Sequence, residues 1–355
     1  MKMKKWTFLA LLAALALLLT ACAAAQAPGA TPTLSAPAAA SDSPEGSPSA
    51  APDGGDAPQT AAEPVRVAGL NGPTGIGLVK LMADHQQDGA YAFTLDSAPD
   101  AIVAKVSSGE ADIAAVPTNL AATLYRKTNG GVQMIALNTL GVLSILENGD
   151  SVQSVSDLAG KTLYATGQAS TPEYVLNYIL SANGLTPGED VQIVYLADHA
   201  ELAAKMAAGE VALGMLPQPH ATSAMMKNPD LRIAVDLTEA WSQVGGGSEL
   251  TQGCLIARTE WAQAHPEALS AFLDDYKAST EYVNAHVPEA AAWVAQFGIM
   301  GTAQAAEKAI PLCNITFVEG EPMKRQVAGF FQVLFDADPK SVGGQMPDDG
   351  LYFIR

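Results

Sequence analysis

The chain has 355 residues, of which 48% are hydrophobic, and it carries 19 basic against 37 acidic side chains for a net charge of −18. So acidic a chain is repelled by nucleic acid and by anionic lipid surfaces, and no cluster of basic residues offsets that repulsion. The composition therefore argues against a nucleic-acid partner and leaves a small-molecule partner open.

The N-terminus has the pattern of a signal peptide. Residues 1–5 contain three lysines, and an uncharged apolar stretch of about 14 residues follows, shorter than the ~20 that a transmembrane helix needs. Small residues then lead to Cys22, a pattern that resembles the lipobox of bacterial lipoproteins. We expect a signal peptide at 1–21 and a lipid on Cys22, which anchors the protein at the extracytoplasmic face of the cell membrane. An ordinary secretory signal with a chance cysteine is the alternative.

Residues 22–63 are nearly all small or polar, with Leu34 as the one large apolar side chain. Such a segment cannot bury enough apolar surface to offset the entropy of ordering, so it predicts a disordered tether. Without the three N-terminal lysines the chain keeps 16 basic and 37 acidic residues, a net charge of −21. The part from residue 64 onward is long enough for two lobes. It contains Cys254 and Cys313, which either form a disulfide or are two buried free thiols.

The first half of this globular part predicts strands and helices in alternation. Ser97 and Asp100 form a start signal for a helix that Gly109 ends. The expected elements are a strand at 65–70, a turn at 71–75, a helix at 76–89, a strand at 91–96, a helix at 101–109 and a strand at 111–117.

The same order returns about 100 residues later. Ser170 or Thr171 caps a helix that Gly184 ends, and Asp198 and Glu201 form a capping box for the next helix. The expected elements are strands at 160–167, 191–196, 211–217 and 231–237, helices at 168–184 and 202–209, and a predominantly helical region after residue 258.

The repetition extends to the residues themselves. AKVSSGEADIAAVP at 104–117 and AKMAAGEVALGMLP at 204–217 share Ala-Lys, Gly-Glu and a closing proline at the same offsets. We interpret the two stretches as the same helix and strand in two β-α-β-α-β units. Such units predict an α/β fold with mostly parallel sheets flanked by helices. Ligands bind beyond the carboxyl ends of such strands, so four loops are expected around one cleft. The candidate ligand-binding residues are Asn71, Gly72, Thr74, Gly75, Pro117, Thr118, Asn119, Gly167, Gln168, Ser170, Thr171, Gln218 and His220.

These candidates also have structural interpretations. The hydroxyls of Ser170 and Thr171 serve equally well as helix caps, worth ~1 kcal/mol. The N–H groups near Gly75 either hold a ligand oxygen or belong to a plain tight turn. The four loops contain no Arg or Lys, so sulfonate, nitrate or carboxylate oxygens and a neutral heterocycle both fit. Trp241 and Tyr164 are either stacking surfaces for a planar ligand or core residues, and Thr139 and Gly141 are weaker candidates.

The sequence gives little support to catalysis. The five histidines show no HExxH or other zinc-binding spacing, and Ser248 does not stand in a G-x-S-x-G motif. We expect no catalytic residue, no metal and no cofactor.

Three segments resemble the substrate-binding proteins of ABC transporters, in particular the binders of aliphatic sulfonates, taurine, nitrate and thiamine-pyrimidine precursors. They are SDLAGKTLYATGQASTPEYVLNYILSANGLTPGEDVQIVYL, AGEVALGMLPQPHATSAM and ARTEWAQAHPEALSAFLDDYKASTEYV. In order and spacing the resemblance covers residue 65 to about residue 335. The chain departs from it at Gly214, where many members carry an acidic residue as Asp112 does in the first unit, and at Gln218 and His220.

The resemblance implies a two-lobed periplasmic-binding-protein-like fold of type II with the ligand cleft between its lobes. Crossovers are expected within 141–149 and 245–258, with residues 64–145 and 250–355 in the first lobe and 146–249 in the second. The lobes would close on the ligand by hinge bending, with glycines 245–247 absorbing the change.

The implied function is that of a monomeric binding protein, which captures a small organic or anionic solute and delivers it to a membrane permease and its ATPase. The alternatives are a sensory module that presents its ligand to a receptor and a secreted enzyme on the same scaffold, such as a pyrimidine-forming relative.

Overall fold

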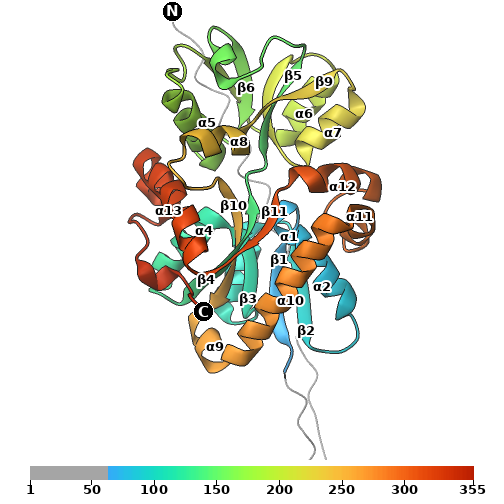
Figure 1. Ribbon diagram of the computed structural model, residues 1–355, viewed down its shortest axis with the longest axis vertical. Helices are drawn as coiled ribbons and strands as arrows, with labels where there is room; N and C mark the ends of the chain where they lie inside the picture. The colour runs from blue at the N-terminus through green and yellow to red at the C-terminus, as the bar shows by residue number, and fades with distance from the viewer. Residues whose placement is uncertain (1–62) are drawn as a thin grey trace, which may run out of the picture. The chain divides into compact units, whose positions relative to one another are not determined.

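The computed structural model of the protein describes residues 63–355 (Figure 1). Every described residue belongs to one compact unit. The predicted signal peptide, Cys22 and the tether up to residue 62 lie outside the described residues. Among the helices that the structure describes, none is both long and apolar enough to cross a membrane.

Six strands form the first sheet, in the order β11-β4-β10-β3-β1-β2. β1 runs parallel to β2 and β3, whereas β10 is antiparallel to β3 and β4, and β11 is antiparallel to β4. The strands are β1 (Val65–Leu70), β2 (Tyr91–Asp96), β3 (Ile113–Pro117), β4 (Val132–Leu140), β10 (Thr251–Arg258) and β11 (Ile315–Val318).

Five strands form the second sheet, in the order β7-β6-β8-β5-β9. β6 runs parallel to β7 and β8, and β5 is antiparallel to β8 and β9. The strands are β5 (Leu143–Asn148), β6 (Thr162–Thr166), β7 (Gln192–Leu196), β8 (Leu213–Pro217) and β9 (Leu231–Asp236). The predicted α/β class, with two sheets flanked by helices, is confirmed. The sheets are mixed rather than mostly parallel as predicted, because three of the five strand pairs in the first sheet and two of the four in the second are antiparallel.

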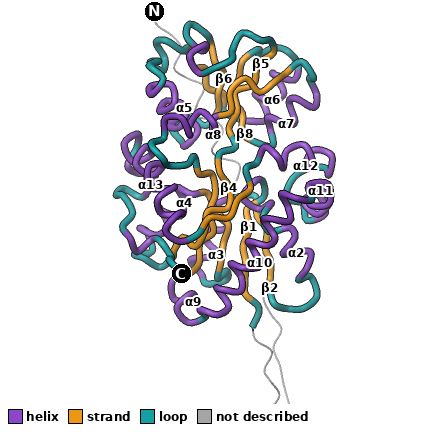
Figure 2. Tube along the Cα trace, viewed as in Figure 1, coloured by secondary structure: helices purple, strands orange, loops and turns teal. Residues whose placement is uncertain are grey.

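Helices flank both sheets, as Figure 2 shows. With the first sheet go α1 (Pro73–Ile76), α2 (Val79–Asp84), α3 (Pro99–Ser108), α4 (Thr118–Lys127), α9 (Thr259–Ala264), α10 (Pro266–Ala285), α11 (Val287–Gln296), α12 (Ala303–Ala309) and α13 (Gly320–Ala337). With the second sheet go α5 (Thr171–Ala182), α6 (His199–Ala207), α7 (His220–Lys227) and α8 (Leu237–Val244). Short 3-10 turns occupy Val155–Leu158, Ile310–Leu312, Pro339–Val342 and Asp349–Leu351.

Alternate residues of the strands supply different hydrophobic cores. In β3, Ala114 and Val116 join one core, and Ile113 and Ala115 join the other. This alternation is the two-residue period of a strand that is covered on both faces. The first of these cores continues into the second sheet, where it includes Leu163. A third, smaller core lies between the second sheet and α6 and α7.

The helix starts differ in part from the sequence prediction. The predicted Asp198 cap is confirmed, because its carboxylate accepts hydrogen bonds from the N–H groups of Ala200 and Glu201. The full capping box is not formed, since the Glu201 carboxylate pairs with Lys205 instead of returning a bond to Asp198. The Ser97 start signal is wrong: Ala98 is the residue before α3, and the Ser97 hydroxyl contacts Asn71 instead.

Two short connections join the sheets. β4 ends at Leu140 and β5 begins at Leu143, so Gly141 and Val142 pass from one sheet to the other. The return connection runs from the end of α8 at Val244 to the start of β10 at Thr251.

Candidate functional site

The predicted ligand-binding residues gather at the carboxyl ends of the parallel strands in each sheet. In the first sheet, Asn71 and Gly72 follow β1, Thr74 and Gly75 lie in α1, Pro117 ends β3, and Thr118 and Asn119 begin α4. In the second sheet, Gly167 and Gln168 follow β6, Ser170 precedes α5, Thr171 begins it, Gln218 follows β8 and His220 begins α7. In such sheets this is the edge where ligands bind.

The loop after β1 is tightly packed. Gly72 has a φ of 100°, and its N–H donates to the carbonyl of Ile299 at 2.9 Å. The N–H of Gly75 donates to the Gly72 carbonyl at 3.0 Å, so this group is engaged within the loop, as the tight-turn alternative predicts. The Thr74 side chain is 5% exposed.

Asn138 on β4 supports this loop from behind. Its side-chain N–H donates to the Thr74 carbonyl at 3.0 Å, and its Oδ1 accepts from the Thr139 hydroxyl at 3.1 Å. Gly253 on β10 makes room for the arrangement, since a Cβ there would lie 2.2 Å from Thr74 Cγ2 and 2.6 Å from Asn138 Oδ1. Thr139 therefore serves this buried network.

At the start of α5 the hydroxyl group of Ser170 is already engaged. Its Oγ donates to the Gly167 carbonyl at 2.6 Å and makes no capping bond to the helix. Gly167 and Ala169 have φ values of 78° and 55°, and the Ala169 N–H donates to the Glu173 carboxylate. The hydroxyl-capping interpretation of Ser170 is therefore wrong, although the residue does stand at the N-cap position.

Gln218 is the most constrained of the candidates. It is 3% exposed, and its Oε1 accepts hydrogen bonds from the Thr222 N–H at 3.3 Å and from the Thr222 hydroxyl at 2.7 Å. Since a backbone N–H can only donate, these bonds fix the orientation of the amide and leave Nε2 as a donor. The Gln218 N–H also donates to the carbonyl of Val142 in the sheet-to-sheet connection, at 2.9 Å.

Four buried polar atoms at these strand ends have no hydrogen-bond partner among the described residues. They are Asn71 Oδ1, Thr118 Oγ1, Gln218 Nε2 and Thr251 Oγ1. Three of them belong to predicted ligand-binding residues, and Thr251 pairs with Leu140 at the start of β10. Buried polar groups are nearly always paired, so such a group at a strand end has a bond to offer a ligand.

Two histidines lie together at the edge of the second sheet. His220 faces His199, the first residue of α6, with ring centroids 5.4 Å apart. His199 Nδ1 is in hydrogen-bond contact with the hydroxyl of Thr166, the last residue of β6. Neither His199 nor Thr166 is among the ligand-binding residues predicted from the sequence. The signal was present, because His199 follows β7 as His220 follows β8.

Other candidates have structural roles. Trp241 is fully buried, and its indole N–H donates to the Ser248 carbonyl at 3.2 Å, so it is a core residue. Tyr164 is half-buried on β6. Cys254 and Cys313 are both buried free thiols, which decides between the two predicted states. Within the described range no three His, Cys, Asp or Glu side chains form a metal-binding group.

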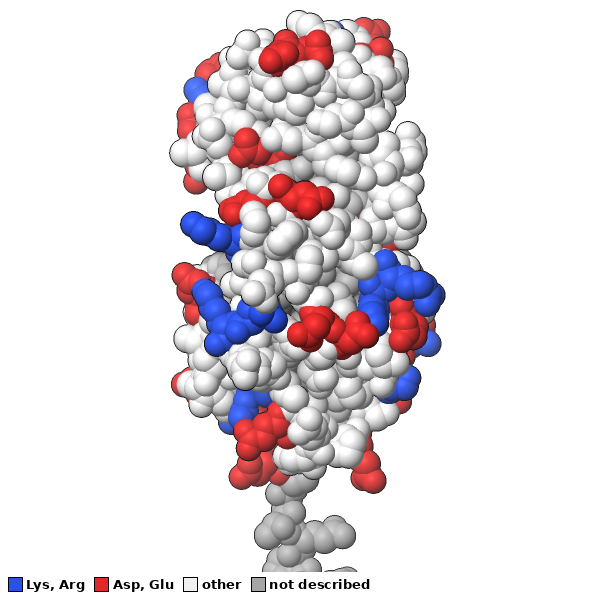
Figure 3. Space-filling view, turned by 90° about the vertical axis from the view of Figure 1, so that its left-hand side faces the viewer, with Lys and Arg blue, Asp and Glu red and all other residues white. Residues whose placement is uncertain are grey.

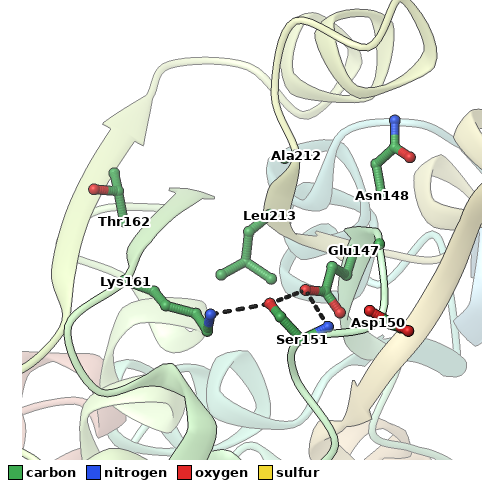
Figure 4. A pocket seen from close by; sticks show the side chains of 9 residues that line it. Glu147, Asn148, Asp150, Ser151, Lys161, Thr162, Ala212 and Leu213 are labelled. Atoms are coloured by element: carbon green, nitrogen blue, oxygen red, sulfur yellow. Dashed lines mark hydrogen bonds between the residues drawn. The ribbon is translucent and has the colours of Figure 1, made fainter.

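Two hollows on the described surface lie away from these loops. One, of about 420 Å³, is lined by Glu147, Ser151, Lys161 and Leu213 among others (Figure 4). It lies where β6 and β8 begin, at the opposite edge of the second sheet from His220. The other, of about 490 Å³, lies in the loop that follows α2. Neither hollow includes a predicted ligand-binding residue. We therefore place the candidate site by the unpaired polar atoms at the strand ends and not by these hollows.

The Glu147 carboxylate in the first hollow is fully engaged. It accepts hydrogen bonds from Ser151 and Val152 and pairs with Arg232 at 2.6 Å.

Basic side chains on the face drawn in Figure 3 lie mostly over its lower part, where the first sheet is. On this face, therefore, no cluster of Lys and Arg side chains lies over the second sheet.

Comparison with known proteins agrees with this fold. The model of the ABC transporter, phosphonate, periplasmic substrate-binding protein family matches residues 91–309, more than half of the chain. None of the curated proteins compared with the chain matches it.

Solved structures of transporter proteins share the fold. An ABC transporter from Parabacteroides distasonis is 24% identical with a TM-score of 0.69, over 82% of this chain and 99% of that one. The aliphatic sulphonate binding protein SsuA from Escherichia coli is 16% identical with a TM-score of 0.62, over 80% and 96%. The alkanesulfonate-binding protein SsuA from Xanthomonas axonopodis, bound to MOPS, is 17% identical with a TM-score of 0.54, over 81% and 96%. The predicted periplasmic-binding-protein-like fold is thus confirmed, and the family match shows that the chain belongs to the phosphonate family of periplasmic substrate-binding proteins of ABC transporters.

Proposed function

We propose that this protein captures a small solute carrying a phosphonate or sulfonate group between two lobes and delivers it to a membrane permease for import. It works as a monomer at the extracytoplasmic face, held by a lipid on Cys22, and releases its ligand chemically unchanged. Membership of the family supports a binding role for the chain. That the ligand carries an oxyanion group, and that the transporter imports it, is what we propose.

The observation that carries the proposal is a set of three unpaired donors at the strand ends; the fourth unpaired atom, Asn71 Oδ1, only accepts hydrogen bonds and is not used in the argument. Thr118 Oγ1 and Thr251 Oγ1 come from the first sheet, and Gln218 Nε2 comes from the second. All three can donate a hydrogen bond. An oxyanion with several acceptor oxygens would satisfy donors from both sheets at once, which is what closure of two lobes on one ligand requires.

We place the lobe boundary at the connections between the sheets. β5 pairs with β8 and β9 from Leu143 onward. Residues 143–145 therefore go with the second sheet, and the first connection is Gly141 and Val142. The second connection is 245–250. These are the segments that would bend when the lobes close.

Neutral donors are sufficient for an anionic ligand at this site. α4, α5 and α7 begin at the same edges, and the unpaired N–H groups at a helix start favour negative charge. A neutral heterocycle is the competing ligand, because it too could use hydroxyl and amide donors.

A thermal-shift screen of residues 23–355 tests the proposal. The panel contains methylphosphonate, 2-aminoethylphosphonate, ethanesulfonate and taurine, with a pyrimidine as the neutral member. A ligand at 100 times its dissociation constant adds ~2.7 kcal/mol to the free energy of unfolding, so the melting temperature rises with concentration. No shift with any of the four phosphonates and sulfonates would overturn the oxyanion proposal, and a shift with the pyrimidine alone would replace it.

Two further measurements address fate and anchoring. The bound ligand is recovered after hours of incubation, and its NMR spectrum is expected to be unchanged; a new product would show an enzyme instead.

Full-length chain expressed in bacteria is expected in the membrane fraction, and Cys22→Ala is expected to move it out of that fraction. Equal membrane recovery of both forms would contradict the lipid anchor.

A further inference from the structure

His199 and His220 form a compact pair above the carboxyl ends of the second sheet. Each is the first residue of its helix, α6 or α7, and the two rings lie 5.4 Å apart at an interplanar angle of 39°. Both rings are half-buried. The Thr166 hydroxyl beside His199 Nδ1 can donate to a neutral ring or accept from a protonated one, so it suits both states of the imidazole.

The surroundings hold the pair neutral when no ligand is present. Burial lowers the pKa of both rings below the ordinary value, and on His199 the neighbouring His220 lowers it further. The helix starts act in the same direction, because the positive end of a helix disfavours a cation. A proton on His220 would repel a second proton on His199, so the pair takes up one proton before two.

Asp198 is the charged group that opposes this effect on both rings. Its carboxylate lies at the start of α6 and accepts hydrogen bonds from two N–H groups of that helix. The other charged groups on α6, on α7 and on the elements packed against them are engaged elsewhere or exposed. Lys205 pairs with Glu201 and Glu210, Arg232 pairs with Glu147, Asp236 caps α8, and Lys227, Glu307 and Lys308 are exposed.

We propose that His199 and His220 supply the positive charge that the ligand site otherwise lacks, by taking up a proton from solvent when an oxyanion binds. This inference rests on the proposed function, since it requires an anion at this edge of the second sheet. The predicted loops contain no Lys or Arg, whereas the pair can become cationic at little cost once an anion lies beside it.

The sign of the pH effect follows from linkage. An anion beside the pair raises the pKa of the histidines in the complex above their value in the free protein. Between these two values binding takes up a proton, and the affinity rises as pH falls, by up to about tenfold per pH unit for one proton. For a ligand of fixed charge we expect about fivefold to tenfold tighter binding at about pH 6 than at about pH 8.

Calorimetry on residues 23–355 tests the inference with ethanesulfonate, whose charge is constant in this range, and with methylphosphonate. Titrations of the native protein in two buffers of different ionisation enthalpy report proton uptake directly, so this arm needs no variant. The H199Q/H220Q double variant is expected to bind ethanesulfonate with an affinity that does not change with pH. His286→Gln, at an exposed histidine between α10 and α11, is the matched control and is expected to keep the native pH dependence.

The other possible outcomes distinguish failure of the histidine inference from failure of the proposed function. Binding of either probe without proton uptake and with the same affinity at both pH values overturns the histidine inference and leaves the proposed function standing. Absence of binding by both probes at both pH values overturns the proposed function and the inference with it. A native-like pH dependence in the double variant would assign the proton to another group.

Discussion

At the scale of single residues, the amide of Gln218 gives the sharpest prediction. Gln218→Glu keeps an acceptor for both bonds from Thr222 but replaces the unpaired Nε2 donor with an oxygen. We expect the fold to persist and the affinity for an oxyanion to fall about tenfold to hundredfold, because a donor to a charged group is lost and a like charge is gained. Isothermal titration with the best ligand of the screen measures this.

The matched control is Gln192→Glu, which makes the same charge change on an exposed residue at the start of β7, away from the loops. It is expected to bind like the native protein. Equal affinities of all three proteins would show that Gln218 Nε2 does not reach the ligand.

Residue roles were predicted from the sequence only where the backbone alone decides them. Asp198 caps its helix as predicted, because an N-cap depends on neighbours two and three positions away. Trp241 could not be assigned, since its burial against Tyr178 and Phe330 depends on contacts distant in sequence. The pairing of His199 with His220 was missed for the same reason. It requires knowing that β6, β7 and β8 are neighbours in one sheet.

At the scale of elements, the close approach of α1 and β10 predicts a severe effect from one methyl group. In Gly253→Ala the new Cβ would meet Thr74 and Asn138, so α1 must shift away from β10. We expect a loss of about 1–3 kcal/mol in the free energy of unfolding, as for overpacking of a core, together with weaker ligand binding. Urea unfolding and calorimetry measure the two effects.

Gly301→Ala serves as the comparison, because nothing lies within 4 Å of the Cβ that it would add and its φ is ordinary. It is expected to change stability by less than about 0.5 kcal/mol. If Gly253→Ala is as stable as Gly301→Ala, then α1 is free to move and does not present a fixed loop to the ligand.

The alternation of strands and helices was predictable at this scale, but the pairing of strands was not. Each β-α-β unit carries local signals such as the left-handed Gly109 that ends α3. β10 inserts between β3 and β4 from more than 100 residues away, and no local pattern encodes that position. The predicted helix at 76–89 corresponds to α2, which spans only Val79–Asp84, so turn residues were included in the prediction, and most of α1 (Pro73–Ile76) falls in the segment predicted as a turn.

At the scale of the whole described unit, Asn314, which directly precedes β11 of the first sheet, bonds to the first connection and to α8 beside the second sheet. Its side-chain N–H groups donate to the Gly141 carbonyl at 2.7 Å and to the Thr238 hydroxyl at 3.4 Å. Asn314 itself has a φ of 48°, a conformation that glycine adopts without strain. Asn314→Gly therefore removes the bonds and keeps the backbone.

We expect this variant to bend more easily between the sheets. Small-angle scattering of the free protein is expected to show a larger radius of gyration than in the native protein, with a similar value once ligand is bound. An unchanged radius in the free variant would mean that Asn314 does not restrain the lobes. Asn284→Gly, which removes a side-chain bond to Ile315 within the first lobe, is the control.

The acid stability of the unit should fall in two steps, because different groups titrate in each. His199 and His220 have lowered pKa values in the folded protein, so the unfolded chain binds more protons as pH falls below about 6.5, and stability is lost from there down to the folded pKa. Burial alone would raise the pKa of Glu147, but bonds from Ser151 and Val152 and the Arg232 pair outweigh it and lower the pKa. Asp348 has a lowered pKa through its bond from Tyr125.

These carboxyl groups stabilise the fold above their ordinary pKa values of 4.5 and 3.8, and that stabilisation is lost as pH falls below them. Urea midpoints measured from about pH 8 to about pH 3 are expected to show both steps. The H199Q/H220Q variant is expected to lose the first step and keep the second, because its remaining carboxyl groups are unchanged. A first step of native size in that variant would mean that other groups cause it. An oxyanion bound beside the histidines would raise their pKa in the folded protein, so adding the ligand is expected to abolish the first step of the native protein.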